Sequence, residues 1–300
     1  MNVIDLFSGC GGLSLGFQNA GHNILAAFDN WDDAIEVYRR NFAHPVIQQD
    51  LSDEAGSIDL ITPFLPDMII GGPPCQDFSS AGNQDEDHGR GGLTVHYANI
   101  VAGVRPEWFL MENVPRITKT QKLVEAKAIF RAAGYGLSEI VLDASLCGAP
   151  QKRKRFVLIG KLGEQDGFMQ EILQRNLSDH PMTIAEYFGE DLNIQFYYRH
   201  PRSYSRRGIY SVNEPSATIR GVNRPMPGGY HAHPNDATQN LEGIRCLTTA
   251  ERSRIQTFPE NFVFLGSKTD QEQMIGNAVP VNLANYIVNA INVYEAEHRQ

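Results

Sequence analysis

A cysteine stands in an unusual frame of glycine and proline residues. Cys75 follows Gly71-Gly-Pro-Pro and comes directly after a short apolar run at residues 67–70. Runs of this length are typical of buried parallel strands, and proline stiffens a loop while removing backbone donors. Open α/β sheets bind ligands at the carboxyl ends of such strands, where Cys75 would lie. A lone cysteine is usually an ordinary buried thiol, but this frame favours a nucleophile.

A glutamate follows a second apolar run in the same way. Glu112-Asn-Val comes directly after residues 108–111. If both runs are parallel strands, Glu112 and Cys75 converge on one crevice. A glutamate in a partly apolar pocket has a raised pKa and can carry a proton at neutral pH. Without the cysteine nearby, a solvated glutamate at a strand end would be the simpler interpretation.

A basic run leads into a further apolar strand. The sequence Gln151-Lys-Arg-Lys-Arg155 precedes residues 156–159. Side chains alternate between the two faces of a strand, so Gln151, Arg153 and Arg155 share one face. A solvated basic surface is the alternative. Alternation into a buried strand favours a face that points at the site.

Glycines and acidic residues mark a possible nucleoside site. The sequence Asp5-Leu-Phe-Ser-Gly-Cys-Gly-Gly12 joins an expected strand to an expected helix, and glycines there let the backbone approach a ligand closely. Asp29 closes the second expected strand, where an acidic group can bind ribose hydroxyls. Asp50 follows the third apolar stretch. Acidic groups suit a neutral or cationic nucleoside better than a pyrophosphate, although a tight turn without a ligand is the simpler alternative.

These residues need a scaffold that brings strand ends together. The first half of the chain alternates short apolar runs with helix-like segments. Strands are expected at residues 2–7, 23–28, 67–70, 108–111 and 156–159, and helices at 13–20, 31–42, 93–104 and 119–133. This rhythm predicts an α/β fold with a doubly wound, mostly parallel sheet.

The composition changes after the last of these strands. Residues 163–243 are rich in Arg, Tyr, Pro, Gly and Asn and show no clear period, whereas a helical pattern returns at residues 281–297. We expect a smaller, loop-rich second domain at residues 164–267. Residues 1–163 and 268–300 would form the first domain.

The net charge of −9 at first argues against a nucleic-acid partner. Arginines nevertheless gather between residues 195 and 245, where only Glu214, Asp236 and Glu242 oppose them. The arginines are Arg199, Arg202, Arg206, Arg207, Arg220, Arg224 and Arg245. A locally basic segment on an acidic protein can hold a phosphate backbone.

Composition also sets expectations about compartment and metal. The four cysteines form no CxxC pair, so neither a zinc site nor a disulfide framework is expected. The first residues show no signal-peptide pattern, and no run of about 18 apolar residues predicts a membrane span. We therefore expect a cytoplasmic protein with reduced thiols.

Six motifs of this chain resemble those of the bacterial DNA (cytosine-5) methyltransferases, in the same order and over nearly the whole length. They are the glycine-rich turn, Pro73-Pro-Cys-Gln, Glu112-Asn-Val, Gln151-x-Arg-x-Arg, the segment from Arg245 to Pro259, and Gly276-Asn-Ala-Val-Pro280. Residues 163–243 fall where that family places its variable target-recognition domain. The resemblance implies the S-adenosylmethionine-dependent methyltransferase fold.

The resemblance also implies a reaction and a set of roles. A methyl group would pass from S-adenosylmethionine to C5 of a flipped-out cytosine in double-stranded DNA, through a covalent Cys75 adduct and without a metal. Glu112 would hold and protonate N3, Arg155 would bind the O2 side of the ring and orient Glu112, and Arg153 is grouped with these catalytic residues. The expected cofactor residues are Phe7 on the adenine, Gly9, Gly11 and Gly12 beside the methionine part, Asp29 on the ribose, Asp50 at the adenine amino group, and Asn277 closing the pocket.

For DNA, the resemblance implies three groups of residues. Gln76, Ser79 and Arg90 would lie in or beside a mobile catalytic loop. Thr218-Ile219 resembles a pair that marks the recognition domain and contacts the backbone near the flipped base. Base and phosphate contacts are expected from Arg199, Arg202, Arg206, Arg207, Arg220 and Arg224. A monomer that protects the site of a partner restriction endonuclease is the expected biological unit.

Three alternatives keep part of this pattern. A transfer-RNA methyltransferase shares the motifs, and assays on both substrates would separate the two. A catalytically silent DNA-binding relative would not need Cys75, Glu112 and Arg155 intact. A nicotinamide-dependent oxidoreductase explains the sheet and the glycine turn but leaves Pro-Pro-Cys-Gln without a role.

Overall fold

The computed structural model describes residues 1–74, 92–203 and 205–298, and these form two compact units. Unit 1 comprises Met1–Leu142, Lys154–Leu177 and Ala284–Gln300, and unit 2 comprises Asp143–Arg153 and Ser178–Leu283. The expected domains differ from these units in three segments: residues 143–153 and 268–283 pack in unit 2, and residues 164–177 in unit 1. That the first domain binds the cofactor and the second recognises the target stays a prediction.

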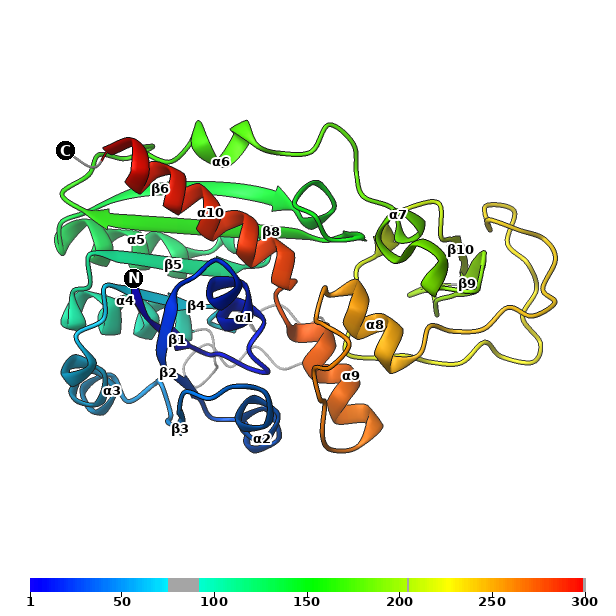
Figure 1. Ribbon diagram of the computed structural model, residues 1–300, viewed down its shortest axis with the longest axis horizontal. Helices are drawn as coiled ribbons and strands as arrows, with labels where there is room; N and C mark the ends of the chain where they lie inside the picture. Colours follow the sequence, from blue (N-terminus) through cyan, green and yellow to red (C-terminus); the bar gives the residue numbers. More distant parts are fainter. Residues whose placement is uncertain (75–91, 204, 299–300) are drawn as a thin grey trace. The chain divides into compact units, whose positions relative to one another are not determined.

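Unit 1 is built on a seven-stranded sheet with the order β3-β2-β1-β4-β5-β8-β6 (Figure 1). The strands are β1 (Asn2–Leu6), β2 (Asn23–Asp29), β3 (Val46–Gln48), β4 (Met68–Gly71), β5 (Trp108–Asn113), β6 (Tyr135–Asp143) and β8 (Lys154–Leu162). The first five are parallel, whereas β8 pairs antiparallel with β5. The predicted α/β fold with a mostly parallel sheet is confirmed.

Helices cover both faces of this sheet, as a doubly wound fold requires. On one face, α4 (Leu93–Val104) and α5 (Gln121–Ala132) bury apolar side chains against the strands. On the other, α1 (Gly12–Asn19) contacts α10 (Val281–His298), because the Asn285 side chain donates to the Gly16 carbonyl. The remaining helices of unit 1 are α2 (Asp32–Asn41), α3 (Glu54–Ile61) and α6 (Ile172–Arg175).

The strand register brings the chemically interesting segments to one edge of the sheet. Leu6, the last residue of β1, is paired with Phe28 near the end of β2 and with Gly71 at the end of β4. Gly71 is in turn paired with Met111, directly before Glu112. The glycine-rich turn and the segments that follow β2, β4 and β5 therefore leave the sheet side by side.

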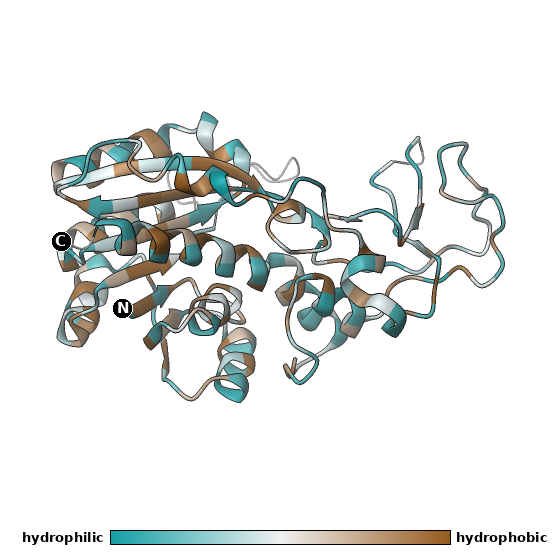
Figure 2. Cartoon of the chain, turned by 45° about the horizontal axis from the view of Figure 1, so that its top comes forward, coloured by the Kyte–Doolittle hydropathy of each residue, from teal (hydrophilic) through white to brown (hydrophobic). Residues whose placement is uncertain are grey.

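Unit 2 has short elements and long loops, as the sequence predicted. It contains the antiparallel pair β9 (Phe196–Tyr198) and β10 (Ile209–Ser211), the parallel pair β7 (Gln151–Lys152) and β11 (Ser216–Ala217), and the helices α7 (Ile184–Phe188), α8 (Thr249–Ile255) and α9 (Lys268–Asn277). All three helices begin with a capping box, in which a Ser or Thr and an acidic residue satisfy backbone donors reciprocally. Figure 2 shows mostly hydrophilic colours on the long loops of this unit and hydrophobic colours along the strands of unit 1.

Candidate active site

The turn after β1 has a backbone that glycine makes possible. Gly9 and Gly11 have positive φ angles of 52° and 94°. A Cβ atom on Gly11 would lie 2.4 Å from the Phe42 ring, so a larger residue does not fit. Phe7 also has a positive φ, 55°, which is uncommon for an aromatic residue. The predicted strand thus ends at Leu6, and Phe7 already belongs to the turn.

Buried polar atoms without partners lie in and next to this turn. Among the described residues, neither Asp5 Oδ1 nor Ser8 Oγ has a hydrogen-bond partner. Asp5 Oδ2 accepts a bond from Ser14 Oγ at 2.6 Å, and burial raises the pKa of Asp5 to about 7. Buried polar groups are normally paired, so an unpaired hydroxyl in a glycine turn fits a site that binds a polar ligand.

The two acidic residues expected at the cofactor have different surroundings. Asp29 Oδ2 accepts the Gly9 N–H at 2.7 Å, while Oδ1 accepts the N–H groups of Asn30 and Trp31. Burial raises the pKa of Asp29, although these three bonds oppose the rise. Asp50 is exposed, and the backbone and hydroxyl of Ser52 lower its pKa. Asp29 therefore shapes the glycine turn itself, and the Asp50 carboxylate is open to solvent.

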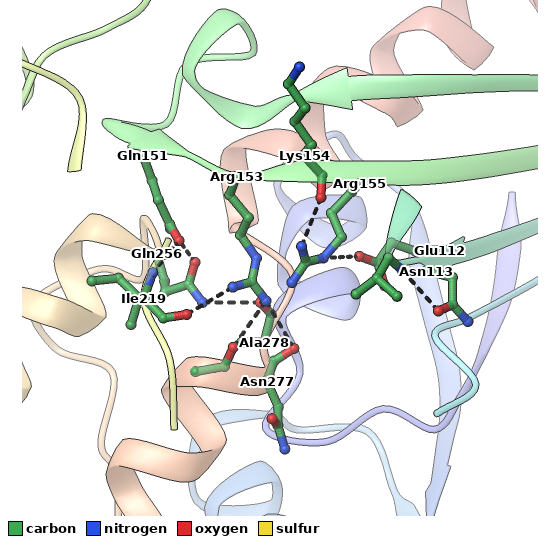
Figure 3. Close-up of polar contacts among 12 residues, drawn as sticks. Glu112, Asn113, Gln151, Arg153, Lys154, Arg155, Ile219, Gln256, Asn277 and Ala278 are labelled. Carbon is green, nitrogen blue, oxygen red and sulfur yellow. Dashed lines mark hydrogen bonds and ion pairs between the residues drawn. The ribbon is translucent and has the colours of Figure 1, made fainter. Parts of the chain in front are cut away.

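Glu112 and Arg155 form a nearly buried ion pair (Figure 3). Arg155 Nε lies 2.7 Å from Glu112 Oε1, and the two side chains are only 12% and 9% exposed. The pair forms because β8 runs antiparallel to β5, so that the start of β8 lies opposite the end of β5. Burial lowers the pKa of Arg155, and the Glu112 carboxylate acts in the opposite direction. The guanidinium fixes the direction in which Glu112 presents its carboxyl group.

The segment that leads to Cys75 begins next to Glu112. The Asn113 side-chain amide donates to the Pro73 carbonyl at 2.8 Å, and a Cβ atom on Gly72 would lie 3.2 Å from Glu112 Oε2. Tyr97 of α4 links β4 and β5, since its hydroxyl contacts the carbonyls of Ile69 and Leu110. The last described residue of this segment, Pro74, directly precedes Cys75. Cys75 lies outside the described residues, as do Gln76, Ser79 and Arg90.

Two of the structural contacts were missed by the sequence analysis. Asn113 had a signal, because it is the middle residue of Glu112-Asn-Val, but its bond to Pro73 joins residues 40 positions apart. Tyr97 lies within a predicted helix, and nothing in its surroundings in the sequence indicates that its hydroxyl is buried between two strands.

Arg153 has its hydrogen-bond partners within unit 2. The predicted alternation is present, since Gln151 and Arg153 are buried while Lys152 and Lys154 are exposed. Within unit 2, however, the Arg153 guanidinium donates to the carbonyls of Ile219 at 3.1 Å and of Gly276 and Ala278 at 3.0 Å (Figure 3). These contacts hold backbone carbonyls of unit 2, and the expected catalytic role of Arg153 stays a prediction.

Asn277 also lies in unit 2. It is the last residue of α9, its side chain is exposed, and its Oδ1 accepts a bond from Gln273 at 3.0 Å. The exposed amide is available to a ligand. Its expected role at the cofactor stays a prediction.

The arginines expected at DNA fall into two classes. Three of them have partners within unit 2: Arg199 donates to the Thr218 carbonyl, Arg207 pairs with Glu214 through two bonds, and Arg220 donates to the His200 carbonyl. The other three, Arg202, Arg206 and Arg224, are exposed. Burial and the nearby charges of Arg199 and Arg202 lower the pKa of Arg220 to about 10.

Thr218 and Arg245 have partners as well. The Thr218 hydroxyl donates to the Lys152 carbonyl at 2.8 Å, and Arg245 pairs with Glu251 through two bonds. Tyr197 and Tyr198 are buried, so aromatic side chains pack beneath this basic segment. The basic composition of the segment therefore overstates how many cations can bind a ligand.

No helix in the described part of the chain is long and apolar enough to cross a membrane. No group of three or more His, Cys, Asp or Glu residues there is arranged to hold a metal ion.

Comparison with known proteins decides the family. The family model described as C-5 cytosine-specific DNA methylase matches residues 1–293. The chain belongs to this family. A bacterial relative, the type II methyltransferase M.HindV of Haemophilus influenzae, is 56% identical to the chain over 298 residues, which cover 99% of this chain and 98% of the relative. M.HgiDI of Herpetosiphon aurantiacus is 52% identical, with 98% of this chain and 95% of the relative covered.

Solved structures of methyltransferases share the fold. The S. pombe Dnmt2 methyltransferase matches with a TM-score of 0.73 and 18% identity, covering all of both chains. A putative DNA modification methyltransferase encoded within an E. coli prophage matches with a TM-score of 0.72 and 24% identity, covering 99% of each. These neighbours share the fold of the chain across both of its units.

Proposed function

We propose that this C-5 cytosine-specific DNA methylase transfers a methyl group from S-adenosylmethionine to C5 of cytosine in double-stranded DNA, with Cys75 as the nucleophile. One observation carries the proposal. The buried Glu112–Arg155 pair lies beside the Pro73 segment that leads to Cys75, and Asn113 links the two. A proton donor and a nucleophile on neighbouring strand ends are what this reaction needs.

The residues around the glycine turn suit S-adenosylmethionine. This cofactor supplies a methyl group on a positively charged sulfur, ready for attack by a carbon nucleophile. Gly9, Gly11 and Gly12 keep the turn free of side chains, and the unpaired Ser8 hydroxyl can bond a polar group there. Asp29, with three backbone donors on its carboxylate, retains acceptor capacity for ribose hydroxyls. Phe7 would stack on the adenine, Asp50 would accept from its amino group, and Asn277 would close the pocket.

The chain's own residues would activate cytosine in successive steps. The Cys75 thiolate adds to C6, and Glu112 donates a proton to N3 as negative charge develops there. The ring then carries an electron-rich C5, which takes the methyl group as the bond between that carbon and sulfur breaks, so that S-adenosylhomocysteine would be the product left behind. Loss of the C5 proton to a base, expulsion of the Cys75 thiolate and return of the N3 proton to Glu112 restore the aromatic ring and the free enzyme. Arg155 keeps Glu112 in place and binds the O2 side of the ring.

Duplex DNA hides both faces of cytosine, so the base must leave the stack. Gln76, Ser79 and Arg90 would contact DNA around the flipped base, and Thr218 would contact the nearby backbone. Sequence recognition would come from unit 2. The exposed Arg202, Arg206 and Arg224 are our candidates for contacts to phosphates or base edges. Arg199, Arg207 and Arg220 would act by shaping the surface, since each has a protein partner.

The names of two relatives support a proposal for the biological setting. M.HindV and M.HgiDI are called type II methyltransferases. We propose that this chain works as a monomer beside a restriction endonuclease that cuts the same site, on DNA in the cytoplasm.

Bisulfite sequencing of DNA treated with the pure protein and S-adenosylmethionine tests the proposal directly. We expect protected cytosines at one short sequence and at no other. Parallel reactions on transfer RNA test the main alternative substrate. Methylated RNA together with unmethylated DNA would overturn the proposal.

A further inference from the structure

Three arginines hold three successive backbone carbonyls of one segment in unit 2. Arg199 donates to the Thr218 carbonyl at 2.8 Å and Arg153 to the Ile219 carbonyl at 3.1 Å. Arg252 donates to the next carbonyl, that of Arg220. Hydrogen bonds from charged donors are stronger than those between neutral groups. The path of the backbone through residues 218–220 is therefore fixed by side chains from three separate parts of unit 2.

The same segment is held at its other atoms too. The Ile219 N–H donates to Gln151 Oε1 at 2.8 Å. A Cβ atom on Gly276 of α9 would lie 2.2 Å from the Gly221 nitrogen, so helix and segment touch backbone to backbone. Arg252 is itself oriented by a buried ion pair with Glu272, at 2.6 Å and with 5% and 3% of the side chains exposed.

After Gly221, successive side chains alternate between solvent and the protein interior. The Asn223 side chain turns inward and donates to the Leu247 carbonyl at 2.9 Å and to Glu272 at 3.2 Å. The Arg224 carbonyl accepts a bond from Cys246 Sγ at 3.0 Å. Val222, between these fixed points, is 56% exposed, and the Arg224 side chain is exposed as well. A rigid support thus presents one apolar and one cationic side chain to solvent.

A single exposed valine needs no explanation by itself. Val222 differs because the backbone on both sides of it is held and because arginines, Arg220 and Arg224, stand two positions before and after it in the chain. Arg199 and Arg202 are close enough to Arg220 to lower the pKa of its guanidinium. A positively charged surface attracts a polyanion. An apolar side chain on that surface makes a favourable contact only where the bound polyanion itself has apolar surface. In DNA, such surface in the major groove is the C5 edge of a pyrimidine.

We propose that Val222 is a specificity-determining residue that contacts the C5 edge of one pyrimidine in the recognised DNA sequence. Arg199, Arg153 and Arg252 are positioning residues: they hold the backbone of residues 218–220 and thereby fix the position of Val222 for this contact. A contact from a rigid backbone discriminates well because little ordering is needed on binding. The inference rests on the proposed function, since it names a residue that would select the DNA site.

The test compares Val222→Ala with wild type on the methylated site and on all single-base variants of it. Val124→Ala is the matched control, because Val124 is 58% exposed but lies on α5 of unit 1. We expect Val222→Ala to lose discrimination at one base pair by about 5- to 100-fold in kcat/KM, and to keep it at all others. The control should match wild type. Unchanged preferences, or an equal loss on every DNA, would overturn the inference.

A second measurement identifies the atom that is contacted. In the same site, each thymine is replaced by uracil and each non-target cytosine by 5-methylcytosine, which changes only the C5 substituent. Wild type should respond to this change at the base pair found above, and Val222→Ala should not. An equal response of both proteins would contradict the contact. If wild type methylates no DNA at all, the proposed function fails instead, so the two failures are distinguishable.

The positioning role has its own test. Arg199→Lys keeps the charge but loses the forked donor that reaches the Thr218 carbonyl. We expect it to relax preference at the same base pair as Val222→Ala, while maximal turnover on the best site stays near that of wild type. Arg175→Lys, an exposed position of unit 1, is the control. If Arg199→Lys lowers activity equally on all sequences, Arg199 serves DNA affinity and not the position of the segment.

Discussion

Gly276→Ala should destabilise unit 2, although alanine favours helices. Gly276 lies in the last turn of α9, where replacing glycine by alanine normally stabilises a helix by about 1 kcal/mol. Here the added Cβ would lie 2.2 Å from the Gly221 nitrogen, 2.4 Å from the Arg220 carbonyl carbon and 2.7 Å from the Gly221 Cα. All three atoms belong to the backbone, so no side chain can rotate away.

The size of the effect follows from two losses. Forcing a methyl group into a packed backbone contact costs about 1–3 kcal/mol. The shift would also separate the Gly276 and Ile219 carbonyls, which share the Arg153 guanidinium, and a charged hydrogen bond is worth about 1.5–3 kcal/mol. After the helix gain is subtracted, we expect the free energy of unfolding to fall by about 1.5–5 kcal/mol.

Urea unfolding of the full chain, followed by tyrosine fluorescence and circular dichroism, measures this change, because Trp31 and Trp108 both lie in unit 1 and unit 2 contains only tyrosines as emitters. Gly228→Ala is the control, because its Cβ would meet no atom within 4 Å and its backbone is not in the left-handed region. The control should lie within about 0.5 kcal/mol of wild type. If Gly276→Ala is as stable as Gly228→Ala, the close contact between α9 and the segment at Gly221 is wrong, and the argument for a rigid recognition segment loses its support.

Three further predictions concern unit 1. Glu112→Gln should lower the methylation rate by about two or more orders of magnitude in single-turnover assays, because the amide cannot donate the proton. Affinity for S-adenosylmethionine should stay unchanged. Loss of cofactor affinity with normal methylation at saturation would show that Glu112 is a cofactor residue. Asn113→Ala should reduce kcat more than cofactor affinity, because it releases the Pro73 carbonyl beside the nucleophile segment, and a variant with wild-type kcat would argue against that positioning. Folded Asp5 keeps its proton up to about pH 7 whereas the unfolded chain loses it near pH 4, so the contribution of Asp5 to the free energy of unfolding should fall as the pH rises between these values and level off above them. The stability of Asp5→Asn relative to wild type should therefore rise with pH across this window in urea titrations, and a constant difference would refute the assignment.

The sequence predicted the parts of the fold that depend on local patterns. The helix expected at residues 93–104 is α4 without a change in bounds. Apolar runs before Cys75 and Glu112 are β4 and β5, because short buried strands need uninterrupted apolar side chains. The chain's C-5 methyltransferase fold follows from such elements, and the comparisons confirm it. The strand β6 (Tyr135–Asp143) was missed, because Gly136, Ser138 and Glu139 interrupt it and it is therefore not one of the continuous apolar runs.

Long-range contacts explain most of what the sequence could not predict. Arg153 and Arg155 have the same local pattern, yet one donates to unit 2 carbonyls 66 and more positions away and the other pairs with Glu112. The arginines of residues 199–224 were expected to contact bases or phosphates, and that role stays a prediction. Composition could not reveal that Arg199 and Arg207 have protein partners, a backbone carbonyl and Glu214.

The covalent role of Cys75 is the central claim, and DNA that carries 5-fluorocytosine at the methylated position tests it most directly. Fluorine cannot leave C5 as a proton does, so the enzyme cannot expel its thiolate after methyl transfer. Wild type with S-adenosylmethionine should form a complex with this DNA that survives denaturing electrophoresis and contains one methyl group. Cys75→Ser should form none, because a serine hydroxyl does not supply the thiolate that adds to C6. A stable complex with Cys75→Ser, or none with a wild-type enzyme that methylates ordinary DNA, would contradict the account.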